Sequence, residues 1–336
     1  MRPAPRSSVL VRPARPVNLA AVRALVVVNP VATSTTPKMR DVIVGALGSR
    51  LKIDLVETGH RGQAHELGAQ AAAEGIDLVV AVGGEGTVSE VVNGILERGP
   101  SPDSPMLAVV PGGSTNVFSR ALGRSRDPVE ATAEILDSLR AGHTRLISLG
   151  RANAAGPKGW SAPRWFVFGA GLGFDAEVIE RVEARRAAGR RSSGALYVRE
   201  ATKAFLLGHD RRHPAMTLQV PGAPPSRDLF LCVVSNVSPF TYLGDRPINP
   251  SPDASFDTGL DVFAMGRVGP LRMMRTLGRA LTDGLPHGRR VHRWHDLGEL
   301  TLTAGRPLGW QADGDHLGEA SALRIQNVPA ALRVVA

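Results

Sequence analysis

Hydrophobic positions over residues 24–141 alternate between two spacings. Short apolar runs, typical of buried strands, are separated by stretches whose apolar residues recur at the 3.6-residue period of a helix. Strands are expected over 24–28, 51–57, 76–82 and 106–110, and helices over 37–49, 62–75, 87–98 and 127–141. Such alternation predicts a doubly wound α/β sheet, which binds its ligands at the carboxyl ends of its strands.

After about residue 145 the pattern changes to strand-like runs separated by turns that contain Gly and Pro. These runs cover 164–169, 215–220, 229–235, 259–264, 299–304 and 322–326, and helical spacing occurs near 176–187 and 268–283. We therefore expect a mostly antiparallel, sandwich-like, β-rich second domain with helical inserts. The predicted divisions are a disordered basic arm (1–20), an α/β domain (21–147) and a β-rich domain (148–327), with 328–336 returning to the first domain.

Composition excludes several classes of protein. The 336 residues are enough for about two domains, and 43% apolar against 21% charged residues favours a folded globular chain. Cys232 is the only cysteine, which excludes an intrachain disulfide framework and a thiolate metal cluster. The sequence has no apolar run of about 18 residues, as a spanning helix needs, and no signal-peptide pattern. A cytoplasmic location is expected.

The net charge of +9 points to an anionic partner. Four arginines fall in the arm, and local excesses of +6 lie at 181–213 (nine basic, three acidic residues) and at 266–293 (seven basic, one acidic). These excesses belong to the second domain and predict contact with an anionic membrane surface, although solvated helix faces would look alike. Nucleic acid is disfavoured, because aromatic residues are only 4% of the chain and no known reader motif is found.

The most informative motif is a strand that runs directly into glycines. Val82 is followed by Gly83-Gly84-Glu85-Gly86-Thr87, and a helix is expected from Thr87 or Val88. Glycines let backbone N–H groups approach a ligand closely, and a helix N-terminus adds partial positive charge, so both suit phosphate. Neither the G-x-x-x-x-G-K-[ST] loop nor G-x-G-x-x-G fits, the latter because Ser89 stands where its last glycine is required.

Two further strand ends carry similar polar turns. Pro111-Gly-Gly-Ser-Thr-Asn116 follows the strand at 106–110, and Asn29-Pro30 follows the strand at 24–28. Carboxyl ends of parallel strands share one edge of a sheet, so these three loops are expected to meet. Their convergence predicts a nucleotide site.

These motifs together resemble the bacterial diacylglycerol kinase-like lipid kinases, which are related to sphingosine kinases and NAD kinases. Gly83–Thr87 is similar to that family's Gly-Gly-Asp-Gly-Thr signature, and Asp313-Gly314-Asp315 to its C-terminal Asp-Gly-Glu motif. The resemblance extends in order over residues 22–336 through Asn29-Pro30, Pro111–Asn116, Pro252–Ala254, Thr258–Asp261 and Trp310–Asp315. It implies ATP-dependent phosphoryl transfer to a lipid hydroxyl, at a cleft between the two domains, by a peripheral membrane protein.

The resemblance also implies roles for individual residues. Asp315 would be the general base, and Asp313 and Glu85 would be candidate ligands or water anchors for the Mg²⁺ carried by ATP. The implied nucleotide-binding residues are Asn29, Pro30, Val31, Ala32, Thr33, Thr58, Gly83, Gly84, Glu85, Gly86, Thr87, Val88, Ser89 and Ser114. A structural Mg²⁺ loop would use Ser255, Thr258 and Leu260. Related bacterial enzymes suggest a homodimer.

Three residues depart from the family pattern and leave alternatives open. Glu85 stands in place of Asp, Asp315 in place of Glu, and Thr258 in place of an Asp that binds Mg²⁺. Hard cations favour charged oxygen ligands, so the last change weakens the structural metal site. The leading interpretation is phosphorylation of diacylglycerol to phosphatidic acid. The alternatives are an NAD kinase-like enzyme, a kinase of sphingoid bases or other lipid alcohols, and a catalytically impaired nucleotide- or lipid-binding homologue.

Overall fold

The computed structural model describes residues 18–32, 36–187, 196, 199–201, 203–204, 214–244, 246–267, 269, 275, 279, 288 and 290–336. The arm expected over 1–20 therefore lies outside the described residues except for its end, where Leu19–Ala21 form a short 3-10 helix. The helix expected over 268–283 lies outside them except for three single positions. Of the described helices, none is long and apolar enough to cross a membrane.

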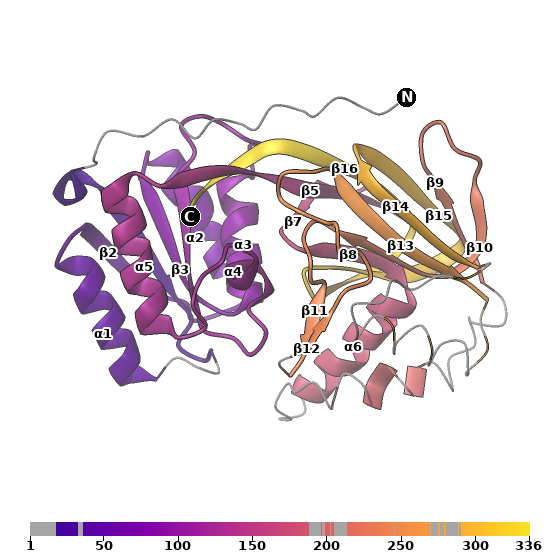
Figure 1. Cartoon of the computed structure of the whole chain (residues 1–336), viewed down its shortest axis with the longest axis horizontal. Helices are drawn as coiled ribbons and strands as arrows, with labels where there is room; N and C mark the ends of the chain where they lie inside the picture. Colours follow the sequence, from indigo (N-terminus) through magenta and orange to yellow (C-terminus); the bar gives the residue numbers. More distant parts are fainter. Residues whose placement is uncertain are drawn as a thin grey trace.

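The N-terminal half is the expected α/β sheet (Figure 1). Its strands are parallel in the order β4-β3-β1-β2. They are β1 (Arg23–Val28), β2 (Lys52–Glu57), β3 (Leu78–Gly83) and β4 (Met106–Pro111). The helices are α1 (Pro37–Gly48), α2 (Gln63–Ala73), α3 (Glu85–Ile95), α4 (Val117–Ala121) and α5 (Pro128–Ala141).

Alternating side chains of β1 place helices on both faces of this sheet. Ala24 and Val26 pack in a cluster with residues of α1 and α5, whereas Leu25 and Val27 pack in a second cluster with residues of α2 and α3. A strand buried on both faces reads as a continuous apolar run, which is why 24–28 carries no polar alternation. The doubly wound arrangement predicted from the sequence is confirmed.

The second half is β-rich and mostly antiparallel, as expected. Its strands are β5 (Thr144–Gly156), β6 (Gly159–Trp160), β7 (Arg164–Phe166), β8 (Gly169–Gly173), β9 (Met216–Gln219), β10 (Ser226–Ser235), β11 (Thr241–Leu243), β12 (Arg246–Ile248), β13 (Leu260–Gly266), β14 (Val291–Leu297), β15 (Glu299–Ala312) and β16 (Asp315–Val335). The order β14-β13-β10-β8-β15-β16 is antiparallel throughout. Helix α6 (Phe174–Ala187) follows β8 directly.

Two long strands connect the halves. From Ala322 to Val335, β16 pairs antiparallel with nearly the whole length of β5, and it ends beside β4, where Val334 pairs in parallel with Leu107. Figure 1 shows β5 and the yellow β16 running together from the β-rich half to the α/β half. The strands of both halves therefore belong to one 14-stranded sheet, apart from β11 and β12, which form a separate two-stranded sheet. The register of β16 shifts between Val328 and Leu332, around Pro329, which has no N–H to donate to a ladder.

Five strands of the second half lie outside the runs expected from the sequence: the short β6, β11 and β12, and the longer β5 and β14. β14 lacks the alternation of apolar and polar residues that marks a strand, because His292 to Asp296 are all polar or aromatic and none of them is fully buried. β5 contains Arg151 and Asn153 among small residues, which hides its strand character. Both strands are specified by their neighbours, β13 and β16, more than by their own composition.

Candidate functional site

The three predicted loops meet at the carboxyl edge of the parallel strands. The Gly112 N–H donates to the Gly83 carbonyl at 2.8 Å, so the ends of β3 and β4 are joined. A Cβ added to Gly113 would lie 3.0 Å from the Gly84 Cα, and one added to Gly83 would lie 2.7 Å from the Thr87 hydroxyl oxygen. Glycine is therefore required for the loops to approach this closely.

The loop after β1 joins the same edge. The Asn29 side-chain amide donates to the Thr87 hydroxyl at 3.2 Å, and the Asn29 amide oxygen accepts from the Val31 N–H. At the end of β2, the Thr58 N–H donates to the Val28 carbonyl at 2.9 Å. Asn29, Thr58 and the start of α3 are thereby held on one side of the sheet. This is the placement that nucleotide binding at these residues requires.

The other residues predicted to bind nucleotide differ in exposure. Gly86 and Ser114 are exposed, and Val31 is 87% exposed despite its apolar side chain. Val88 and Ser89 are buried in α3, and the Val88 N–H already donates to the Gly84 carbonyl at 3.2 Å, so the N–H groups left for a ligand are those that precede Val88. Pro30 is exposed and Ala32 and Gly84 are partly buried. Thr33 lies outside the described residues.

Glu85 faces the loop after β4. Its two carboxylate oxygens accept from the Val117 N–H at 2.6 Å and from the Thr115 hydroxyl at 2.8 Å. The Val117 N–H begins α4, so Glu85 caps that helix from another part of the chain. Burial raises the pKa of Glu85, and these two hydrogen bonds oppose the rise. The carboxylate therefore connects two loops of the site.

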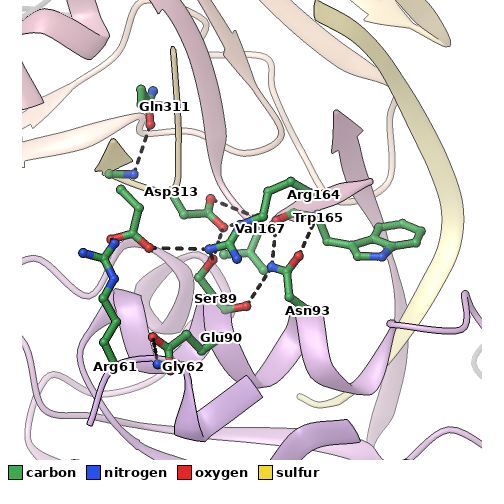
Figure 2. A network of polar contacts seen from close by, with 12 residues as sticks. Arg61, Gly62, Ser89, Glu90, Asn93, Arg164, Trp165, Val167, Gln311 and Asp313 are labelled. Atoms are coloured by element: carbon green, nitrogen blue, oxygen red, sulfur yellow. Dashed lines mark hydrogen bonds and ion pairs between the residues drawn. The ribbon is translucent and has the colours of Figure 1, made fainter. Parts of the chain in front are cut away.

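Asp313 is the most deeply embedded acidic residue of the site, with only 3% of its surface exposed. Its carboxylate accepts from the backbone N–H groups of Val167, Phe168 and Gly169 at 2.9–3.3 Å and from the Ser89 hydroxyl at 3.1 Å. Figure 2 shows Asp313 beside Val167 and Ser89. Burial raises the pKa of Asp313 to about 6, against the effect of these donors. With these donors in place, Asp313 fastens the turn after β15 to β7, β8 and α3.

Asp315 lies two residues further on and is more accessible. Its side chain is 20% exposed and faces two guanidinium groups, Arg61 at 3.3 Å and Arg164 at 3.5 Å. The intervening turn places Asp313 (φ 51°) and Gly314 (φ 77°) in the left-handed region and pairs Ala312 with Asp315. Positive φ at both central residues is typical of a tight two-residue hairpin turn, for which Asp-Gly is a preferred sequence. The turn projects one carboxylate inward and keeps the other at the site.

Arg61, Arg164 and Asn93 are site residues that sequence reasoning missed. Arg61 lies in the loop that follows β2, three residues after Thr58. Its position at the carboxyl end of a parallel strand could have indicated that it belongs to the site. The side chain of Asn93 in α3 bonds to both backbone groups of Trp165, donating to its carbonyl and accepting from its N–H. It thereby joins the two halves beside Arg164 (Figure 2). No local pattern distinguishes Asn93 or Arg164 from other polar residues.

Gln311 connects the Asp313–Asp315 turn to helix α6. The Gln311 side-chain amide donates to the Asp175 carboxylate at 2.6 Å, and its oxygen accepts from the Gly314 N–H at 3.1 Å. Burial raises the pKa of Asp175 to about 6, with the Gln311 hydrogen bond opposing the rise. Gln311 is thus fixed at both ends and holds the Asp313–Asp315 turn against the start of α6.

The loop expected to hold a structural Mg²⁺ is closed by hydrogen bonds among its own residues. The Thr258 hydroxyl donates to the Ser255 carbonyl at 3.1 Å, and the Ser255 hydroxyl accepts from the Asp257 N–H. The neighbouring carboxylate of Asp257 is paired with Arg145 at 2.6 Å. Across the described part of the chain there is no group of three or more His, Cys, Asp or Glu side chains placed to hold a metal. The structural Mg²⁺ at Ser255, Thr258 and Leu260 stays a prediction.

Comparison with known families finds a match in the α/β half. Residues 23–152 match the family model described as diacylglycerol kinase catalytic domain. The resemblance to diacylglycerol kinases is confirmed. The diacylglycerol kinase match runs from β1 into β5, so it includes the glycine loops and Glu85 but ends before Asp313 and Asp315.

Curated relatives that match part of this chain are also diacylglycerol kinases. A diacylglycerol kinase of Bacillus subtilis (strain 168) is 40% identical over 92 residues, which are 27% of this chain and 28% of that protein. A diacylglycerol kinase of Staphylococcus epidermidis is 36% identical over 140 residues, which are 39% of this chain and 40% of that protein. The matched region thus spans about two fifths or less of these relatives' length.

Solved structures show that the likeness in fold covers both halves. A diacylglycerol kinase from Bacillus anthracis has a TM-score of 0.66 at 20% identity, over 93% of this chain and 96% of the other. An NAD kinase from Archaeoglobus fulgidus in complex with ATP has a TM-score of 0.51 at 12% identity, over 94% of each chain. The two-domain α/β fold predicted from the sequence is confirmed.

Proposed function

We propose that this chain transfers the γ-phosphoryl group of ATP to the hydroxyl group of a membrane lipid, with diacylglycerol as the favoured acceptor. The observation that carries the proposal is the position of Asp315, a partly exposed carboxylate held beside the start of α3 by a rigid turn. The diacylglycerol kinase match in residues 23–152 and the names of the relatives favour this reaction over others that a carboxylate beside a glycine loop could serve.

In the proposed reaction, the backbone N–H groups around Gly84 to Gly86 and the start of α3 hold the phosphates. The lipid hydroxyl oxygen attacks the γ-phosphorus, the bond from that phosphorus to the bridging oxygen breaks, and ADP leaves with that oxygen. Asp315 orients the hydroxyl and accepts its proton, which then passes to water. Such transfers depend on positioning and charge stabilisation more than on covalent chemistry by the protein.

Mg²⁺ would arrive with ATP as part of the substrate and would neutralise phosphate charge. The two carboxylates that sequence reasoning offered as its ligands, Glu85 and Asp313, have their oxygens occupied by N–H and hydroxyl donors of the protein. We therefore assign Glu85 to holding the loop after β4 and Asp313 to holding the turn. No step of the proposed reaction passes through either carboxylate.

An assay with labelled ATP tests the proposed function. The purified chain is incubated with Mg²⁺ and γ-labelled ATP in mixed micelles that contain diacylglycerol, a sphingoid base, ceramide or a polyprenol, and the lipid products are separated. We expect label in phosphatidic acid, and more of it than in any other product. NAD serves as the competing soluble acceptor. Phosphorylation of NAD without lipid phosphorylation would contradict the proposal, and so would ATP binding without transfer to any lipid.

We also infer that the second half contacts anionic membrane, as a peripheral protein. The support is the excess of basic residues at 181–213 and 266–293, most of which lie outside the described residues. Within the described part, Trp160 at the tip of the β5–β6 hairpin is 43% exposed, and the Arg324 guanidinium lies 4.2 Å from the centre of its ring. An exposed Trp beside cations is typical of side chains at a membrane interface.

Vesicle co-sedimentation tests the membrane inference. Binding is expected to rise with the fraction of anionic lipid and to fall as salt increases, because salt screens exposed charges over a Debye length of about 10 Å at 0.1 M. Trp160→Ser should weaken binding to the same vesicles at low salt. Binding that changes neither with the fraction of anionic lipid nor with salt concentration would contradict the inference. The homodimer implied by the resemblance stays a prediction.

A further inference from the structure

Two arginines from different halves of the molecule converge on one carboxylate. Arg61 belongs to the loop between β2 and α2, and Arg164 begins β7. The Arg61 guanidinium lies 3.3 Å from one carboxylate oxygen of Asp315, and the Arg164 guanidinium lies 3.5 Å from the other. Figure 2 labels both arginines. Direct charge-assisted N–H···O bonds are usually about 2.7–2.9 Å long, so Asp315 fits loosely between the two cations. A larger anion would fill the same space better.

Both arginines are positioned by contacts that do not involve Asp315. The Gly62 N–H donates to the Glu90 carboxylate at 2.9 Å, which ties the Arg61 loop to α3. The Arg164 guanidinium donates to the Ser89 hydroxyl at 3.2 Å. The Arg164 Nε is buried and has no hydrogen-bond partner among the described residues. The Arg164 guanidinium and the loop that carries Arg61 are therefore held at α3 by contacts that do not depend on Asp315.

The position of these cations matches a need of the proposed reaction. Charge builds up on the oxygens of the phosphoryl group during transfer, and arginine is well suited to planar, two-pronged contact with phosphate oxygens. The sequence has no P-loop lysine that would supply this charge. Of the two side chains, Arg61 is the more accessible to an incoming phosphate, with 67% of its surface exposed against 22% for Arg164.

We propose that Arg61 and Arg164 form a clamp for the γ-phosphoryl group of the nucleotide, and that the Asp315 carboxylate occupies this clamp when no nucleotide is bound. The inference rests on the proposed function. When the γ-phosphate enters, its oxygens take over the guanidinium contacts and Asp315 is released toward the lipid hydroxyl. The general base therefore becomes available only when the phosphoryl donor is in place.

Comparing two nucleotides isolates the contribution of the clamp. Calorimetry measures the affinity of the full chain, with Mg²⁺, for ADP and for a non-hydrolysable ATP analogue that carries the γ-phosphate. Arg61→Ala is expected to weaken binding of the analogue by about tenfold, the effect of losing about 1.4 kcal/mol, and to leave ADP binding within about twofold. Arg61→Lys should recover part of the loss. Arg50→Ala, on an exposed arginine that follows α1 at the opposite edge of the sheet, is the matched control.

Asp315→Asn tests the competition directly. Removing the charge of the resident anion should tighten binding of the ATP analogue several-fold without changing ADP binding. If Arg61→Ala weakens ADP and the analogue equally, or weakens neither, the clamp is overturned while the proposed function stands. The same holds if Asp315→Asn leaves the analogue's affinity unchanged. If the wild-type chain binds neither nucleotide, the proposed function fails and the inference fails with it.

Discussion

Asp315→Asn is expected to lower the rate of lipid phosphorylation by about 10²- to 10⁴-fold, the usual contribution of a positioned general base. Asparagine has the same shape but cannot accept the proton of the attacking hydroxyl. The change should fall on kcat, because Asp315 acts on the attacking hydroxyl and saturating ATP removes any effect of the substitution on nucleotide affinity. The measurement is transfer of labelled phosphate to diacylglycerol in mixed micelles, under saturating ATP.

Three companion measurements make this prediction specific. Asp315→Glu, which restores the carboxylate that the resembling family carries here, should retain more activity than Asp315→Asn. The melting temperature of Asp315→Asn should stay close to that of the wild type, because the side chain is 20% exposed and its two arginine contacts are long. Full activity of Asp315→Asn would exclude Asp315 as the base. A large drop in its melting temperature would show that the loss is structural.

Asp313→Ala is expected to destabilise the fold by about 3–5 kcal/mol, the usual cost of removing one partner from a buried charged contact. The backbone N–H groups of Val167, Phe168 and Gly169 would lose their acceptor in the interior. Alanine also tolerates the positive φ of this position poorly, since φ at Asp313 is 51°. The measurement is denaturation of the chain in urea, followed by fluorescence and by circular dichroism.

Two variants separate the causes of the destabilisation. Asp313→Asn tolerates positive φ and keeps one amide oxygen as an acceptor, so it should be less destabilising than Asp313→Ala. Asp103→Ala, on an exposed loop residue before β4, is the matched control and should leave stability within about 0.5 kcal/mol of the wild type. Near-wild-type stability of Asp313→Ala would contradict the role of its carboxylate in holding the turn.

The fold of the first half could be predicted from the sequence because its signals are local. The apolar run at 24–28 needs burial on both faces, and the structure gives it helices on both sides. The second half was harder, because β14 and β5 are held by pairing with β13 and β16 and their own sequences alternate poorly. Long-range pairing overrides weak local preference in such strands.

For the site, the sequence by itself determined which loops could approach a phosphate. Glycines at Gly83, Gly84 and Gly113 permit close backbone contact regardless of what surrounds them, and the parallel strand order places them at one edge. It also determined that the chain resembles diacylglycerol kinases, since the motifs occur in order. These are properties of short segments, so they can be read without knowing the tertiary structure.

Only the tertiary structure decided what each carboxylate does. The resemblance offered Asp313 as a ligand or water anchor for Mg²⁺ and Asp315 as the base. In the structure, a two-residue turn directs Asp313 onto buried N–H groups and leaves Asp315 between Arg61 and Arg164. Glu85 looks like a metal ligand, but its oxygens are taken by groups of the loop after β4. The charge that a carboxylate meets depends on residues distant in the chain, and only folding brings those residues together.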